Sequence, residues 1–152
     1  MRVALLVLAV SAAIIPARAE EPLVGVWKLA GQQLNGEKTD FETLTLRIAQ
    51  KGDRIAFAFS VPVNNIHYLS MQYVVRLDGS EADIKNGEGV KLGSIKMSKT
   101  GSGQYAFTLQ GPNRPETSGK LTVSSDAKHL TSESQGEQNG RPMRLVQQFE
   151  RP

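Results

Sequence analysis

The sequence of 152 residues contains no cysteine. Disulfide bonds, thiolate zinc sites, a cysteine nucleophile and a lipidated N-terminal cysteine are therefore excluded, because each of them needs the sulfur atom. Aromatic residues are also few, at 6%, whereas 39% of the residues are hydrophobic and 22% are charged. A disordered chain has more charge and fewer residues that can build a core. We therefore expect one folded domain.

Histidine is almost as scarce as cysteine, since the sequence has only His67 and His129. With two imidazoles and no thiol, the sequence favours no metal site and no cofactor. No serine can be placed on a strained turn beside a histidine and a carboxylate, which a hydrolytic triad requires. We expect a protein that is not an enzyme.

Long apolar runs are absent except at the start of the chain, where Met1 and Arg2 precede an apolar run from Val3 to Ile15 and the small residues of Ala17-Arg18-Ala19. This order is typical of a secretory signal peptide. The apolar run has 13 residues, and a membrane-spanning helix needs roughly 20. We predict a signal peptide over 1–19, a mature domain over 20–152, no stable membrane anchor, and export to the periplasm or the extracellular space.

The net charge of +3 comes largely from the predicted signal peptide. Without Arg2 and Arg18 the chain has 16 Lys and Arg against 15 Asp and Glu, a net charge of +1. A nearly neutral domain lacks the basic surface that attracts phosphate backbones, so we expect no nucleic-acid partner. The sequence does not indicate a protein partner.

After residue 20, short segments alternate apolar and polar side chains with a period of two. Each segment thus has one apolar face, as a half-buried β-strand does. Turn sequences such as Asn35-Gly36, Asp78-Gly79 and Asn139-Gly140 separate the segments and favour tight hairpins. The expected strands lie at 24–29, 44–48, 55–61, 69–77, 82–84, 95–97, 105–109, 121–123, near 130, and 143–149.

Consecutive hairpins predict an all-β fold. Closing the sheet removes its two exposed edges, so we favour an antiparallel up-and-down β-barrel of about 8–10 strands over a sandwich. The polar segment 31–41 lacks the alternation. We expect it to form a loop, or a short helical turn that covers one end of the barrel.

Gly25 and Trp27 form a Gly-x-Trp pattern on the first expected strand, and the chain ends Phe149-Glu150-Arg151-Pro152. With the Asp78-Gly79 turn and the Val-Ser-x-Asp-x-Lys pattern at 123–128, this order of motifs resembles the calycin superfamily, and within it small exported bacterial lipocalin-like domain proteins. The resemblance implies that Gly25 and Trp27 close one end of the barrel and that an arginine packs over the indole. Arg151 is the first candidate for that arginine and Arg144 the second.

A stripe of apolar and aromatic residues on neighbouring strands could line an internal cavity. The alternative is that these side chains fill the barrel completely, since barrels of about eight strands range from packed to hollow. Tyr73, Tyr105 and His67 are the polar groups that would orient a guest. The candidate ligand-lining residues are Ile55, Phe57, Phe59, His67, Leu69, Met71, Tyr73, Tyr105, Phe107 and Leu109.

By analogy with calycins, we predict an exported lipocalin-like barrel that binds a small, mostly apolar ligand. The competing interpretation is a packed barrel that acts as a protein-interaction or inhibitor module and holds no internal ligand. A ligand-binding barrel needs a lumen of roughly 300 Å³ or more, whereas an interaction module needs an exposed apolar patch.

Overall fold

The computed structural model describes residues 19–152. The predicted signal peptide therefore lies outside the described residues, apart from its last position. Within 19–152 the chain forms eleven β-strands and no helix. The strands are β1 (Gly25–Leu34), β2 (Glu37–Lys38), β3 (Thr45–Lys51), β4 (Arg54–Val63), β5 (Ile66–Arg76), β6 (Asp78–Lys85), β7 (Lys91–Gly101), β8 (Gln104–Gln110), β9 (Thr117–Val123), β10 (His129–Gln138) and β11 (Arg141–Glu150).

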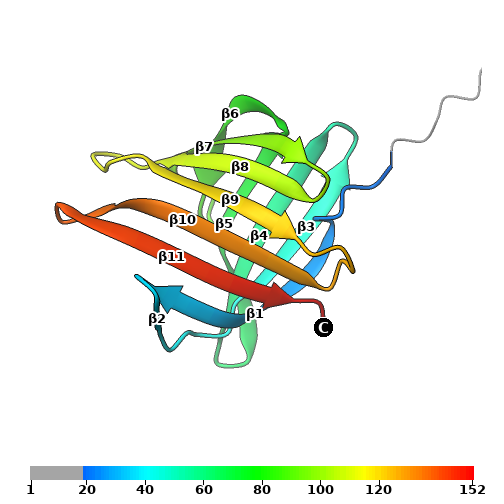
Figure 1. Cartoon of the computed structure of the whole chain (residues 1–152). Helices are drawn as coiled ribbons and strands as arrows, with labels where there is room; N and C mark the ends of the chain where they lie inside the picture. Colours follow the sequence, from blue (N-terminus) through cyan, green and yellow to red (C-terminus); the bar gives the residue numbers. More distant parts are fainter. Residues whose placement is uncertain (1–18) are drawn as a thin grey trace, which may run out of the picture.

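The strands follow one another around a single closed sheet (Figure 1). Each long strand pairs antiparallel with the next one in the sequence, and β11 returns to pair with β1 from Glu150–Lys28 to Leu145–Leu34. The two-residue β2 pairs only with the end of β1. The result is a ten-stranded antiparallel up-and-down barrel, and the prediction of an all-β barrel is confirmed.

The prediction of a loop or helical turn over 31–41 was wrong for its first part. Strand β1 continues to Leu34, and Asn35 and Gly36 form a hairpin turn with φ of 50° and 87°. Both residue types tolerate positive φ, which a tight hairpin requires. The backbone N–H of Arg144 on β11 also donates to the Asn35 side-chain oxygen at 2.8 Å. Pairing with β11 thus extends a strand whose own sequence is polar.

Hydrophobic residues at alternate positions point into the barrel interior. We call the end covered by residues 20–24 the closed end and the opposite one the open end. At the open end the β4–β5 hairpin carries exposed side chains from Pro62 to Ser70. The buried core residues are Leu23, Trp27, Leu46, Ile48, Ile55, Phe57, Tyr73, Val75, Ile84, Ile95, Met97, Tyr105, Phe107, Leu121, Val123, Leu130 and Phe149.

The barrel wall has a seam between β5 and β6, where Gln72 and Lys85 are the single paired position. Toward the closed end the seam is bridged from the next strand, since the backbone N–H of Lys99 on β7 donates to the Leu77 carbonyl at 3.1 Å. On its other side β5 is fully paired with β4. The two edges of β5 therefore differ in their hydrogen bonding.

We expect amide hydrogen exchange along β5 to alternate. Amides from Tyr73 to Arg76 that donate to β4 should exchange slowly, whereas their neighbours that point into the seam should exchange at least about tenfold faster, because they lack a ladder partner. Exchange followed residue by residue by NMR measures this directly, with residues 130–135 of β10, which are paired on both sides, as the internal reference. Uniform protection along β5 would show that the seam is closed in solution.

Candidate functional site

The barrel encloses a cavity of about 170 Å³ between the closed end and the open end. Eleven of its fourteen lining side chains are hydrophobic or aromatic, and the other three are Ser132, Ser134 and Gln147. The apolar set is Leu46, Phe57, Phe59, Met71, Tyr73, Ile95, Phe107, Leu109, Leu121, Leu145 and Phe149.

An aromatic cluster forms the wall on β4 and β5. Phe57 and Tyr73 are cross-strand partners, and their rings stack with centroids 4.8 Å apart. Phe59 adds a tilted contact with Tyr73 at 5.9 Å. Burial raises the pKa of Tyr73, so its hydroxyl stays protonated at neutral pH. Among the described residues no side-chain hydrogen bond involves this hydroxyl, and it is available to a guest.

The opposite wall is polar and comes from β10 and β11. Ser132 and Ser134 lie two residues apart on one face of β10, and Gln147 on β11 pairs with Ser132. The Gln147 Nε2 donates to Gln32 Oε1 at 2.9 Å, and Gln32 Nε2 donates to Thr39 Oγ1 at 3.1 Å. This chain of amides fixes the orientation of the Gln147 side chain and leaves its carbonyl oxygen as an acceptor.

Trp27 fills the closed end of the barrel. Its side chain is fully buried, and its Nε1–H donates to the Leu23 carbonyl at 2.8 Å. The Arg151 guanidinium carbon lies 4.2 Å from the centroid of the indole ring, an arrangement that gives a cation–π attraction. Gly25 lies beneath the Arg151 guanidinium with φ of +143°, and a Cβ on Gly25 would collide with this guanidinium. Arg144, the second candidate, lies beside Glu133 instead.

Solved structures similar to this barrel include two proteins that are covered over almost their whole length. The ileal bile acid-binding protein of zebrafish, complexed with cholic acid, has a TM-score of 0.58 and 21% identity, with 87% of this chain and 100% of that chain covered. A secretory abundant heat soluble (SAHS) protein of Ramazzottius varieornatus has a TM-score of 0.62 and 12% identity, covering 88% and 98%. Both are calycin barrels. The chain has the calycin fold. No protein-family model and no curated protein sequence matches it.

In this barrel of calycin fold, six of the ten residues that the sequence suggested as ligand-lining border the cavity. They are Phe57, Phe59, Met71, Tyr73, Phe107 and Leu109. Ile55 and Tyr105 are buried toward the closed end and lie outside the cavity lining. Their strands run past the cavity, so the apolar stripe on each strand is longer than the cavity itself.

His67 and Leu69 also lie outside the cavity lining, for a different reason. The pairing register of β4 and β5 shifts between Phe59 and Ser60, and beyond Ser60 β4 has no further pairing with β3. Leu69 is 37% exposed, and His67 is exposed as well. Period-two alternation in the sequence cannot reveal where a strand leaves the barrel wall.

The polar wall was missed because the strand around Leu130 looks weak in the sequence. The segment Thr131–Gln138 contains polar residues and one glycine, which read as a solvent-exposed face on both sides. The sequence signal that could have found this wall is the position of Leu130. Because alternate residues of a strand share one face, a strand with Leu130 inward also has Ser132, Ser134 and Gly136 inward. Small inward residues leave space in the interior, and this space is part of the cavity.

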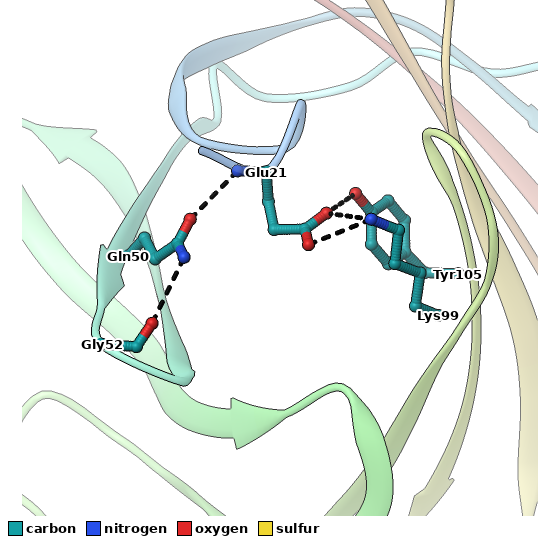
Figure 2. Close-up of polar contacts among 5 residues, drawn as sticks. All are labelled: Glu21, Gln50, Gly52, Lys99 and Tyr105. Carbon is teal, nitrogen blue, oxygen red and sulfur yellow. Dashed lines mark hydrogen bonds and ion pairs between the residues drawn. The ribbon is translucent and has the colours of Figure 1, made fainter. Parts of the chain in front are cut away.

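A partly buried carboxylate anchors the segment that covers the closed end. Glu21 accepts hydrogen bonds from the Tyr105 hydroxyl at 2.8 Å and from Lys99 Nζ at 3.0 and 3.1 Å (Figure 2). Its backbone N–H donates to Gln50 Oε1 at 3.0 Å. Burial, and then the Glu21 carboxylate, raise the pKa of Tyr105. The second residue of the predicted mature chain thus ties β3, β7 and β8 together.

Replacing Glu21 by alanine is expected to reduce the free energy of unfolding by about 1–3 kcal/mol, because the Tyr105 hydroxyl loses a charged acceptor. The double variant with Tyr105→Phe should cost less than the sum of the two single changes, since each removes the same hydrogen bond. Urea denaturation measures all three values. Glu20→Ala, at the exposed neighbouring position, is the matched control and should be neutral; equal losses at Glu20 and Glu21 would contradict the anchoring role.

Among residues 19–152 no helix is long and apolar enough to cross a membrane. The same residues hold no group of three or more histidine, aspartate or glutamate side chains placed to bind a metal ion.

Proposed function

We propose that this barrel binds a small, mostly apolar molecule in its interior cavity. The observation that carries the proposal is the cavity itself, with an aromatic wall on β4 and β5 and with hydroxyl groups on Tyr73, Ser132 and Ser134 that no side chain of residues 19–152 occupies. The similar zebrafish protein, whose structure contains cholic acid, supports a binding role by analogy of fold.

The size of the cavity limits the guest. At about 170 Å³ it is smaller than the roughly 300 Å³ of typical ligand pockets. It is comparable to an engineered apolar protein cavity of about 150 Å³, which is large enough to bind benzene. With the side chains where they are, the guest has the size of a single ring, and a larger guest requires that the wall move.

Export completes the proposal. Cleavage after Ala19 would leave Glu20 as the first residue and Glu21 as the second. The mature chain would then begin at the closed end of the barrel, and its second residue, Glu21, would accept the hydrogen bond from the Tyr105 hydroxyl. Sequencing the N-terminus of the protein recovered from the periplasm or medium tests this step.

The test of binding has two parts. Native mass spectrometry of the protein purified gently from its own host shows whether a small molecule remains bound. Titration with toluene, followed by NMR, tests the cavity directly. Ser134→Phe places a ring in the cavity and should abolish binding, whereas Gln135→Phe places the same ring on the exposed face of the same strand and should not. Equal binding by both variants would show that toluene binds elsewhere.

A second candidate function is an interaction module, and an exposed apolar patch favours it. At the open end Val63, Ile66, Tyr68 and Leu69 on the β4–β5 hairpin are 37–58% exposed. The β6–β7 turn approaches this hairpin, since a Cβ on Gly87 would collide with the Leu69 carbonyl oxygen. Two results together would favour this function over ligand binding. The purified protein would contain no small molecule and would not bind toluene, and a partner protein would bind the parent but not the Ile66→Ser variant.

A further inference from the structure

We propose that the cavity selects uncharged molecules that carry a hydrogen-bonding group, such as a hydroxyl or a carboxamide, and rejects carboxylates of the same size. This inference rests on the proposed function and names the chemical class of its ligand. It follows from what the cavity wall contains and from how its polar groups are placed.

The wall carries no charge at neutral pH. None of the fourteen lining residues is lysine, arginine, histidine, aspartate or glutamate. A carboxylate that enters such a cavity loses its hydration and gains no cation in return, and this exchange is strongly unfavourable. A neutral guest of the same shape avoids that loss.

The wall nevertheless offers more hydrogen-bonding capacity than a purely apolar guest can use. Ser132 and Ser134 have hydroxyl groups without side-chain hydrogen bonds among the described residues, and Gln147 keeps a free carbonyl oxygen beside them. A hydroxyl can donate or accept, whereas the Gln147 oxygen accepts only. A guest with an O–H or N–H group therefore satisfies this side of the cavity better than a hydrocarbon does.

Tyr73 supplies the matching group on the far side. In a ring of ten strands β5 lies five steps from β10, so the Tyr73 hydroxyl and the two serines approach the cavity from opposite walls. Stacking on Phe57 holds the tyrosine ring in place. One wall therefore provides the Tyr73 hydroxyl as a neutral donor beside the aromatic surface of Phe57. The other wall provides the serine hydroxyls, which donate or accept, and the Gln147 oxygen, which accepts.

Ordered water is the alternative occupant of the polar wall. A water molecule needs two to four polar partners, and Ser132, Ser134 and Gln147 could supply them. If water stays there when a guest binds, the polar wall contributes nothing to selectivity. The experiment must therefore separate direct recognition of the guest from hydration of the wall.

Four probes of nearly equal size make this separation: toluene, phenol, benzamide and benzoate, each titrated at pH 7 by calorimetry or NMR. Phenol and benzamide should bind at least about tenfold more tightly than benzoate, because the ionised group has no partner. In the Ser132→Ala/Ser134→Ala variant, the preference for phenol over toluene should fall roughly threefold to tenfold. Gln135→Ala, on the exposed face of the same strand, is the matched control and should keep the preference.

The Tyr73→Phe variant provides an independent reading, since it removes one hydroxyl and keeps the ring stacked on Phe57. It should weaken phenol binding and leave toluene binding unchanged. Benzoate bound as tightly as benzamide would overturn the inference and leave the proposed function standing. A phenol preference that survives all three hydroxyl removals would also overturn it, because these hydroxyls would then not recognise the guest. Failure of all four probes, toluene included, would overturn the proposed function as well.

Discussion

Replacing Trp27 by alanine is expected to lower the free energy of unfolding by about 3–5 kcal/mol, the usual cost of removing a large buried aromatic side chain. Trp27 is fully buried at the closed end. Its removal leaves a cavity, deprives the Leu23 carbonyl of its indole donor, and takes away the surface on which Arg151 lies. Three contributions are lost together, so this position should be among the most sensitive in the chain.

The measurement is urea denaturation followed by far-UV circular dichroism, because the variant lacks the only tryptophan of the protein. Arg151→Ala is the informative comparison. It should cost less than Trp27→Ala, since the guanidinium lies at the surface and contributes a cation–π attraction of about 0.5–2 kcal/mol together with bonds to Pro22 and Ala127. A Trp27→Ala variant as stable as the parent would contradict the role of the indole in closing the barrel.

The sequence predicts the barrel well because two local signals agree along most of the chain. Alternation in segments such as 55–59 and 121–123 marks strands with one buried face, and Asn-Gly or Asp-Gly turns mark the hairpins between them. Consecutive hairpins leave little choice of topology, and closure follows from the need to remove the sheet edges. The same local signals define the aromatic wall of the cavity around Phe57 and Tyr73.

The features that the sequence does not predict depend on contacts between distant segments. Glu21 meets Tyr105, 84 positions away, and nothing local distinguishes this carboxylate from its neighbour Glu20. The inward direction of Ser132 and Ser134 depends on the register of β10 against β9 and β11. The sparse pairing between β5 and β6 is likewise a property of the closed sheet. The alternation of apolar and polar residues and the turn sequences specify the strands. The pairing register in the closed barrel then determines which polar side chains face inward.

The second large effect is expected at Gly119, whose missing side chain makes room for an aromatic ring. Gly119 on β9 pairs with Phe107 on β8 and faces the barrel interior. A Cβ at this position would overlap the edge of the Phe107 ring and the backbone carbonyl oxygen of Glu133. The carbonyl belongs to a paired strand and cannot move easily, so the ring must turn away, and the space beside it is the cavity that Phe107 lines.

Gly119→Ala should therefore act on stability and binding at once. We expect a loss of about 1–3 kcal/mol in the free energy of unfolding, the typical cost of overpacking a core, and a loss of toluene and phenol binding as the Phe107 ring enters the cavity. Urea denaturation and calorimetric titration measure the two effects. Adding Phe107→Leu to Gly119→Ala should restore part of both, because a smaller side chain no longer needs the space above residue 119. If Gly119→Ala leaves stability and binding unchanged, the Phe107 ring does not lie against the Cα of residue 119. The cavity wall would then not be formed by Phe107 in the position that the structure gives it.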